Sequence, residues 1–298
     1  NNTPAIVVAV IKSGELIHIS TDGTRDIEKN LPAALNTPFH IASVSKTVTS
    51  LAIFLLVESG KLDLQKDING YLPFQITNPH HPTDTITIQQ LLNHHSGIID
   101  DYHGVYLPFW DKPKGDNTMP LKIFLSEYLV KGGSYYSEKN FKRGKNFKKF
   151  NYSNTGYALL GLIIEQVSGM SFSEYSKANI FDPLGLKNTG WFLSDFNESD
   201  VAKSYTFRVE KRGAVGITRA LQLRWEDTFG ESGAIEVGEG YVPGTPIAFD
   251  EGLRLSLGEG DLYKDDYFTI STETSSVRLA QDLVLHLGAT KAGGGLEV

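Results

Sequence analysis

Apolar side chains recur every three or four residues over residues 44–58, a spacing that predicts an amphipathic helix with one face on a core. The positions are Val44, Val48, Leu51, Ala52, Leu55 and Leu56. Gly60 follows the run, and a glycine just beyond the last turn is a common helix end. Further apolar runs predict a short helix within residues 85–97 and helices over residues 154–169 and 171–181.

Two segments predict β structure. Residues 5–20 have the pattern of two strands joined by a turn at Ser13–Gly14, with β-branched residues on both sides. After residue 207 helical periodicity largely disappears, and 14 of the 29 glycines fall in under a third of the chain. Short apolar segments separated by Gly, Asp or Pro are typical of antiparallel strands, with residues 275–288 as a helical exception.

We therefore expect an α+β protein with two regions, residues 1–206 and residues 207–298. The second region is expected to be a separate β-rich domain with its own core. The alternative is a single fold in which residues 207–298 supply a partner strand for residues 5–11, because an isolated strand pair is marginal in water. Residues 100–120 contain three prolines and many aromatic residues, and we expect a long loop there.

Composition narrows the classes of function. Hydrophobic residues are 40% and charged residues 21% of the 298 residues, as in ordinary globular proteins. The net charge of -7 argues against a general nucleic-acid binder, and no apolar run approaches the roughly 18–20 residues that span a bilayer. The absence of cysteine excludes disulfides, thiolate catalysis and cysteine-based metal sites. We expect neither a cofactor nor a metal.

Ser43 and Lys46 lie three residues apart at the start of the first predicted helix. Positions i and i+3 share a helix face, so the lysine amine can reach the serine hydroxyl. A serine hydroxyl becomes a good nucleophile when a neighbouring base takes its proton, and a lysine whose surroundings favour the neutral amine can be that base. The helix N-terminus adds backbone N–H groups near the attacking oxygen. Alternatively, Ser43 is an ordinary helix cap.

A second polar group, Tyr152, Ser153 and Asn154, directly precedes the apolar helix at residues 154–169. A phenol beside a lysine can carry a proton between nucleophile and leaving group, and an asparagine amide can hold a substrate carbonyl. Taken alone, these residues fit a helix cap at Asn154 beside a core tyrosine better.

Together the two motifs resemble the serine β-lactamase and penicillin-binding protein superfamily. SVSK at 43–46 and YSN at 152–154 look like its first two motifs, and the tyrosine form is similar to the class C β-lactamase, D-alanyl-D-alanine carboxypeptidase and esterase branch. LLNHHSGI at 91–98 and PLGLKNTGW at 183–191 resemble two further segments of that branch. The resemblance covers about residues 4–206 and implies a β-lactamase/transpeptidase-like fold, a helical lobe plus an antiparallel sheet, in an incomplete form.

The resemblance implies that Ser43 forms an acyl-enzyme, that Lys46 and Tyr152 transfer protons and that Asn154 positions the substrate. The backbone N–H of Ser43 would be half of the oxyanion hole. The implied substrate is a D-Ala–D-Ala peptide, a β-lactam or an ester, and the implied location is the periplasm or the cell exterior. The chain begins at Asn1 without a Met, so we expect a mature or trimmed form whose signal peptide is no longer visible.

The superfamily's third motif, K-T-G or H-x-G on a strand beside the nucleophile, has one match here, with His286 and Gly288 as substrate-binding residues. Only ten residues follow Gly288, too few for the further strand and long helix that complete the family's sheet. The other interpretation of His286 is therefore a histidine on an edge strand or a helix.

Residues 240–270 resemble instead the outer β domains of flagellin and hook-associated proteins. This resemblance and the doubtful third motif favour an alternative function: a non-catalytic surface or filament component with a remnant hydrolase-like scaffold.

Several other polar groups receive simpler interpretations. We expect His94, His95 and Ser96 to shape a loop rather than react, and the pair His80–His81 to be solvated rather than to bind a metal. A basic run before Tyr152 is either a solvated face or a surface that attracts a substrate carboxylate. Its members are Lys139, Lys142, Arg143, Lys145, Lys148 and Lys149. The expected partner is a small molecule or peptide with a carboxylate, not a nucleic acid, and the oligomeric state is left open.

Overall fold

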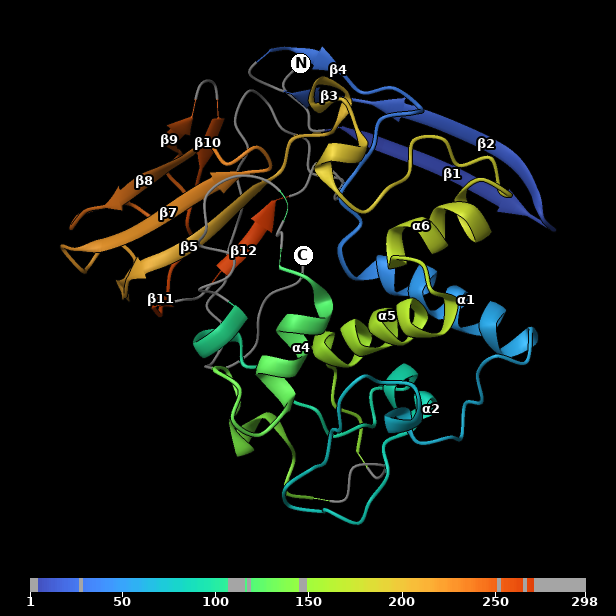
Figure 1. Cartoon of the computed structure of the whole chain (residues 1–298). Coiled ribbons are helices and arrows are strands. Elements are labelled where there is room, and N and C mark those ends of the chain that lie inside the picture. The colour runs from blue at the N-terminus through green and yellow to red at the C-terminus, as the bar shows by residue number, and fades with distance from the viewer. Residues whose placement is uncertain are drawn as a thin grey trace. The chain divides into compact units, whose positions relative to one another are not determined.

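The structure is a computed structural model, and it describes residues 5–26, 29–106, 116, 119–144, 149–250, 253–264 and 267–270. These residues form two compact units (Figure 1). The helical unit comprises the described residues between Ile41 and Trp191, and the β unit those within Asn1–His40 and Phe192–Val298. The strands from Tyr205 onward thus share a unit with residues 5–40. Autonomous folding of residues 207–298 stays a prediction.

The helical unit contains the predicted helices and one that the sequence patterns did not indicate. Its α-helices are α1 (Ser45–Glu58), α2 (Ile88–Leu92), α4 (Leu121–Leu129), α5 (Asn154–Ser168) and α6 (Phe172–Ser176). Short 3-10 turns lie at Ala42–Val44, Ile68–Gly70 and Glu138–Asn140, and single π-helical turns at Tyr102–Tyr106 and Lys177–Phe181. The unpredicted helix is α4.

Helix α5 is the centre of this unit's core. It lies between α1 and α4 and also contacts α2 and α6 (Figure 1). Buried apolar residues occur on nearly every side of this helix; they include Leu159, Leu160, Leu162, Ile163 and Ile164. Gly169 ends the helix in the left-handed conformation, with φ at 74°, which glycine adopts without steric cost. The unit is therefore organised around the helix that directly follows Tyr152.

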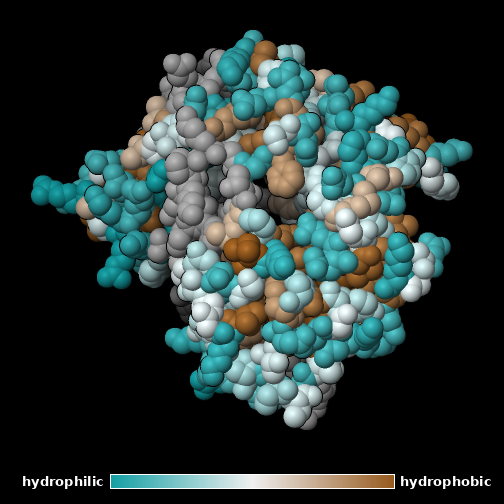
Figure 2. Space-filling model, viewed as in Figure 1, coloured by the Kyte–Doolittle hydropathy of each residue, from teal (hydrophilic) through white to brown (hydrophobic). Residues whose placement is uncertain are grey.

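Helix α1 is less amphipathic than its spacing predicts. It buries Ala52, Ile53 and Leu56, whereas Leu51 and Phe54 are 43% and 49% exposed. Figure 2 shows apolar side chains (brown) at the surface among polar ones (teal). The helix itself is confirmed, but only part of its apolar surface is covered by the described residues of its own unit.

The β unit begins with the predicted hairpin. Strands β1 (Ile6–Lys12) and β2 (Glu15–Asp22) pair antiparallel, and the turn at Ser13 and Gly14 has positive φ at both residues, as expected of a tight hairpin turn. Among the described residues these two strands form a sheet by themselves, and most of their apolar side chains are exposed. A partner strand from residues 207–298 for residues 5–11 is therefore not found in the described part of the chain.

A four-stranded antiparallel sheet, in the order β12–β5–β7–β8, forms most of the remaining unit. Its strands are β5 (Tyr205–Lys211), β7 (Leu221–Asp227), β8 (Ser232–Val237) and β12 (Tyr267–Ile270). Every second residue of β7 is buried, and Phe249 packs its ring against Phe207 and Trp225 in the same core. The antiparallel strands predicted after residue 207 are confirmed. The helix predicted at residues 275–288 lies outside the described residues.

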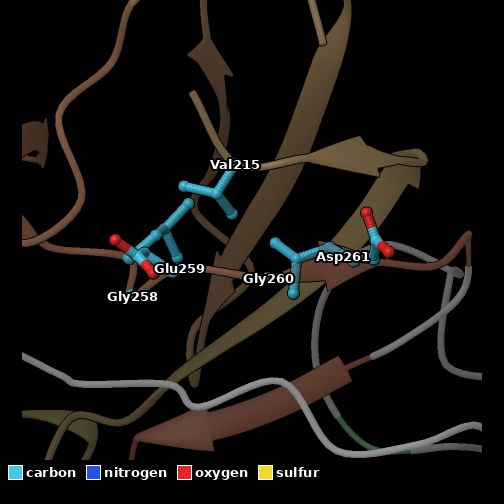
Figure 3. A pocket seen from close by; sticks show the side chains of 7 residues that line it. Val215, Gly258, Glu259, Gly260 and Asp261 are labelled. Atoms are coloured by element: carbon cyan, nitrogen blue, oxygen red, sulfur yellow. The ribbon is translucent and has the colours of Figure 1, made fainter. Parts of the chain in front are cut away.

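Shorter strand pairs complete the β unit. They are β3 (Thr24–Asp26) with β4 (Leu31–Pro32), β6 (Gly213–Ala214) with β11 (Asp261–Leu262), and β9 (Ile247–Asp250) with β10 (Leu253–Leu255). Figure 3 shows a small hollow where Val215 faces the chain at Gly258–Asp261; the N–H of Val215 donates to the carbonyl of Gly260 there.

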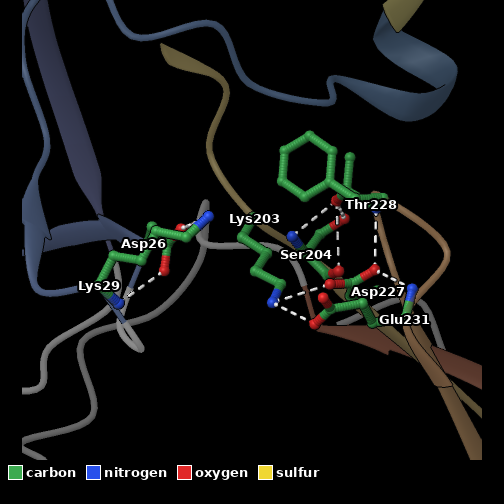
Figure 4. Close-up of polar contacts among 8 residues, drawn as sticks. Asp26, Lys29, Lys203, Ser204, Asp227, Thr228 and Glu231 are labelled. Atoms are coloured by element: carbon green, nitrogen blue, oxygen red, sulfur yellow. Dashed lines mark hydrogen bonds and ion pairs between the residues drawn. The ribbon is translucent and has the colours of Figure 1, made fainter. Parts of the chain in front are cut away.

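A buried ion pair lies at one end of the sheet. The Nζ of Lys203 is 2.8 Å from Oδ2 of Asp227, and both side chains are almost fully buried (Figure 4). The N–H of Lys203 donates to the carbonyl of Arg25, which ties the segment before β5 to β3. Buried charges are tolerated when they are paired, and removal of one partner of such a pair is strongly destabilising.

Candidate active site

Ser43 lies on the 3-10 turn immediately before α1, with its side chain exposed. The preceding residue, Ala42, has φ at 41°, in the left-handed region that costs a non-glycine residue roughly 1–2 kcal/mol. The N-cap of α1 is Val44, and no side-chain capping bond is made there. Ser43 is therefore not a helix cap, and its hydroxyl is held by other contacts.

Those contacts are Lys46 and Tyr152. The Nζ of Lys46 donates to Oγ of Ser43 at 3.1 Å, as the i, i+3 spacing predicts. The phenol oxygen of Tyr152 lies 2.5 Å from the same Oγ, from a position 109 residues further along the chain. Tyr152 is 38% exposed, so it is not a core tyrosine. The fold thus brings the two sequence motifs onto one hydroxyl.

Asn154 faces the same group. Its Oδ1 accepts a hydrogen bond of 2.7 Å from Nζ of Lys46. The N-cap of α5 is Ser153, whose Oγ accepts from the N–H of Gly156. The helix cap is therefore Ser153 and not Asn154 as the alternative expected, and the Asn154 side chain contacts the lysine instead. The catalytic roles assigned to these residues stay predictions.

Asp100 holds the start of α5, although no sequence signal indicated it. Its Oδ2 accepts from the N–H of Asn154 at 2.6 Å, and its Oδ1 accepts from the N–H and hydroxyl of Thr155 and from Oγ of Ser153. A carboxylate is favoured at a helix N-terminus. It comes here from a loop 54 residues away, which no local pattern reveals.

His94 lies beside the phenol. Its ring is 4.5 Å from the ring of Tyr152, and its Nδ1 accepts from the N–H of Ser153 at 3.1 Å. Burial, and then the nearby Lys46 ammonium, lower the pKa of His94 below its ordinary 6.5, against a smaller opposing effect of Asp100. The lowered pKa favours the neutral ring. Because Nδ1 accepts a hydrogen bond, the proton of the neutral ring lies on Nε2.

The remaining predicted groups either lie outside the described residues or make other contacts. His286 and Gly288 lie outside the described residues, as do Lys145 and Lys148 of the basic run. The Nε2 atoms of His80 and His81 lie within hydrogen-bond distance of the carbonyls of Glu138 and Arg143. In the part of the chain that the structure describes, no group of three His, Asp or Glu side chains is placed to bind a metal, and no helix could cross a membrane.

A family model decides the classification, because the model named Beta-lactamase matches residues 1–224. The chain belongs to the Beta-lactamase family. The match covers both motifs that converge on Ser43 and extends into the first strands of the large sheet. The resemblance to the serine β-lactamase and penicillin-binding protein superfamily is confirmed. The resemblance of residues 240–270 to flagellar proteins stays a prediction.

Similar proteins of the Beta-lactamase family support a penicillin-recognising fold for this chain. A penicillin-binding protein of Bacillus subtilis is 34% identical over 183 residues, which are 61% of this chain and 37% of that protein. Protein flp of Staphylococcus aureus strain MRSA252 is 31% identical over 261 residues, 88% of this chain and 47% of that protein. The chain thus spans less than half the length of these relatives.

Solved structures agree with this classification. An octameric penicillin-binding protein homologue from Pyrococcus abyssi is 32% identical, with a TM-score of 0.53 over 68% of this chain and 44% of its own. A penicillin-binding protein from Bacillus halodurans is 30% identical, with a TM-score of 0.54 over 68% of this chain and 57% of its own. The predicted α+β, β-lactamase/transpeptidase-like fold is confirmed.

Proposed function

We propose that this chain is a serine hydrolase that forms an acyl-enzyme at Ser43, with a D-Ala–D-Ala peptide, a β-lactam or an ester as substrate. The observation that carries the proposal is the convergence of two proton-transfer groups on one exposed hydroxyl. Oγ of Ser43 is 3.1 Å from Nζ of Lys46 and 2.5 Å from the phenol oxygen of Tyr152. A nucleophile needs a base within about 2.6–3.2 Å, and the Lys46 distance meets that condition while the Tyr152 contact is shorter still.

The reaction follows from these contacts. Oγ of Ser43 bonds to the substrate carbonyl carbon, and its proton passes to Lys46 or Tyr152. The bond between that carbon and the leaving group then breaks, and the Tyr152 phenol gives a proton to the leaving atom. On the Tyr152 route this is the proton taken from Ser43; on the Lys46 route the phenol gives its own proton and regains one from Lys46. Water repeats the sequence on the acyl-enzyme, which releases the acid and restores the Ser43 hydroxyl. Asn154 supports the lysine, because its Oδ1 accepts a hydrogen bond from Nζ and so holds the amine beside Oγ of Ser43.

Covalent labelling tests the proposal. The protein is incubated with a fluorescent penicillin and, separately, with a fluorophosphonate, and the adduct is located by mass spectrometry of peptides. We expect an adduct on Ser43 that is absent in Ser43→Ala. Ser45→Ala is the matched control, because Ser45 begins α1 and its hydroxyl donates to the carbonyl of Ala42 rather than to the lysine.

Labelling of Ser45→Ala at the wild-type rate, together with an unlabelled Ser43→Ala, supports the acyl-enzyme. No adduct with either probe in the wild-type chain would refute it and would favour the alternative, a non-catalytic surface protein with a hydrolase-like scaffold. Attraction of a carboxylate substrate by the basic residues at 139–149 and a location in the periplasm or outside the cell belong to the same proposal.

A further inference from the structure

His94 occupies a backbone position that suits glycine better than histidine. It ends α2 in a Schellman motif: the N–H of His95 donates to the carbonyl of Gln90, and the N–H of His94 donates to that of Leu91. In this motif the residue after the cap is left-handed, and φ of His94 is 56°. Glycine is usual at such a position, and asparagine, aspartate and histidine are the other side chains found there most often. A histidine here costs more backbone energy than a glycine would, and the contacts of its ring supply a reason for its presence.

His94 contacts Tyr152 and both of its chain neighbours. Its carbonyl accepts from the N–H of Asn151 at 2.7 Å, and its Nδ1 accepts from the N–H of Ser153 at 3.1 Å. The residues before and after Tyr152 are thus both held by the same histidine. The third contact is ring to ring, with the centroids of His94 and Tyr152 4.5 Å apart and the planes inclined by 30°.

The ring of His94 is held in turn by its other neighbours. Tyr157 on α5 lies 5.0 Å from it on centroids, and Phe150 meets it edge-on at 5.5 Å. The Tyr157 hydroxyl donates to the carbonyl of Leu92, at the end of α2. The end of α2 and the start of α5 are therefore packed together through His94, with Tyr152 between that packing and Ser43.

We propose that His94 is a positioning residue of the Ser43 site, which holds the Tyr152 phenol at the nucleophile through its Nδ1 acceptor and its ring face. This inference rests on the proposed acyl-enzyme function. His94 does not touch the reacting atoms and acts only through Tyr152 and the backbone on either side of it. A misplacement of about 1 Å in a reacting group can cost about 10²-fold in rate.

Two substitutions separate this role from a structural one. His94→Gly suits the left-handed backbone but removes the ring and the acceptor, so a purely structural residue would be replaced with equal or higher stability. His94→Asn also tolerates that backbone, and its Oδ1 can accept from the N–H of Ser153 in place of Nδ1. His95→Gly is the control, because His95 lies in the same turn and only its ring edge approaches Phe150.

The experiment measures the rate of Ser43 labelling by the fluorescent penicillin and the fluorophosphonate, and the melting temperature, for the full chain and each variant. For His94→Gly we expect the acylation rate to fall roughly 10- to 10²-fold, whereas the melting temperature should change little because relief of the left-handed strain offsets the lost ring contacts. His94→Asn should recover part of the loss, and His95→Gly should be labelled at the wild-type rate.

Wild-type labelling in His94→Gly would overturn the inference and leave the acyl-enzyme intact. Equal losses in His94→Gly and His95→Gly would also overturn it, because the effect would belong to the loop as a whole. If His94→Gly is unfolded, His94→Asn decides alone: a folded variant with a wild-type rate refutes the ring contact. An unlabelled wild-type chain refutes the proposed function itself, which distinguishes the two failures.

Discussion

The Nζ of Lys46 lies 2.7 Å from Oδ1 of Asn154, so residues 108 positions apart share one hydrogen bond at the proposed nucleophile. This hydrogen bond holds the lysine amine beside both Ser43 and the first residue of α5. The cation also lies 4.8 Å from the centroid of the Tyr152 ring, within the range of a cation–π contact.

Removal of the lysine is expected to abolish acylation but not the fold. In Lys46→Ala the labelling rate of Ser43 should fall about 10²- to 10⁴-fold, the usual contribution of a general base. Alanine is the best helix former, so α1 should persist, as circular dichroism can verify. Lys66→Ala removes a lysine whose amine lies over the ring of Tyr71 instead and should label normally. Retained labelling in Lys46→Ala, within a few-fold of wild type, would assign the base to Tyr152 or another group.

Removal of the Tyr152 hydroxyl should likewise slow acylation without disturbing the fold. Tyr152→Phe keeps the ring against His94 but removes the oxygen 2.5 Å from Oγ of Ser43. We expect a fall of about 10²-fold or more in the single-turnover acylation rate, with little change in stability. Tyr157→Phe removes a hydroxyl that donates to the carbonyl of Leu92. That control should change the melting temperature more than the labelling rate; the reverse pattern contradicts the prediction.

Acid should affect the site through His94. Its pKa is lowered below 6.5 by burial and by Lys46 of α1, with Asp100 raising it and His95 lowering it less. Tyr152 and Tyr157 also face the ring. A native pKa below the unfolded value makes this stabilisation fully present above pH 6.5, and it is lost as pH falls through the native pKa.

The check is a pair of pH profiles between pH 4 and 8, for unfolding by urea and for Ser43 labelling. Protonation of Nδ1 would remove the acceptor of the Ser153 N–H, so labelling should decline at the acid end together with stability. His94→Asn cannot take up that proton and should lack this acid limb. An identical limb in both proteins would attribute it to another group.

Breaking the buried ion pair of the β unit should lower the free energy of unfolding more than breaking an exposed ion pair does. Lys203→Met leaves the fully buried carboxylate of Asp227 without a cation, although its Oδ1 still accepts from the N–H groups of Phe229 and Glu231. We expect a loss of roughly 3–5 kcal/mol in the free energy of unfolding. The control is Lys177→Met, which breaks the exposed pair of Lys177 with Asp182 and should cost about 1 kcal/mol or less. Urea unfolding followed by circular dichroism compares them; equal small losses would show that Asp227 is relieved by rearrangement or water.

Local sequence determined much of this protein. The three-to-four-residue period predicts α1 and α5, the period of two predicts the strands after residue 207, and Ser13–Gly14 predicts the first hairpin turn. These elements follow from spacing because a helix or a strand buries one set of side chains at a fixed interval. The short distance from Ser43 to Lys46 also follows from spacing, since both lie within one helical turn.

Only the tertiary structure decided the rest of the site. The 109-residue separation between Ser43 and Tyr152 is closed by packing of α5 on α1, which no local period encodes. Asp100 carried no motif of its own, and His94, although part of LLNHHSGI, was expected only to shape a loop. Much of what both residues hold is backbone N–H groups, which any residue type presents. Sequence patterns identify residues whose chemistry is in their side chains. Residues that act by holding a neighbour's backbone become visible only when the chain has folded around them.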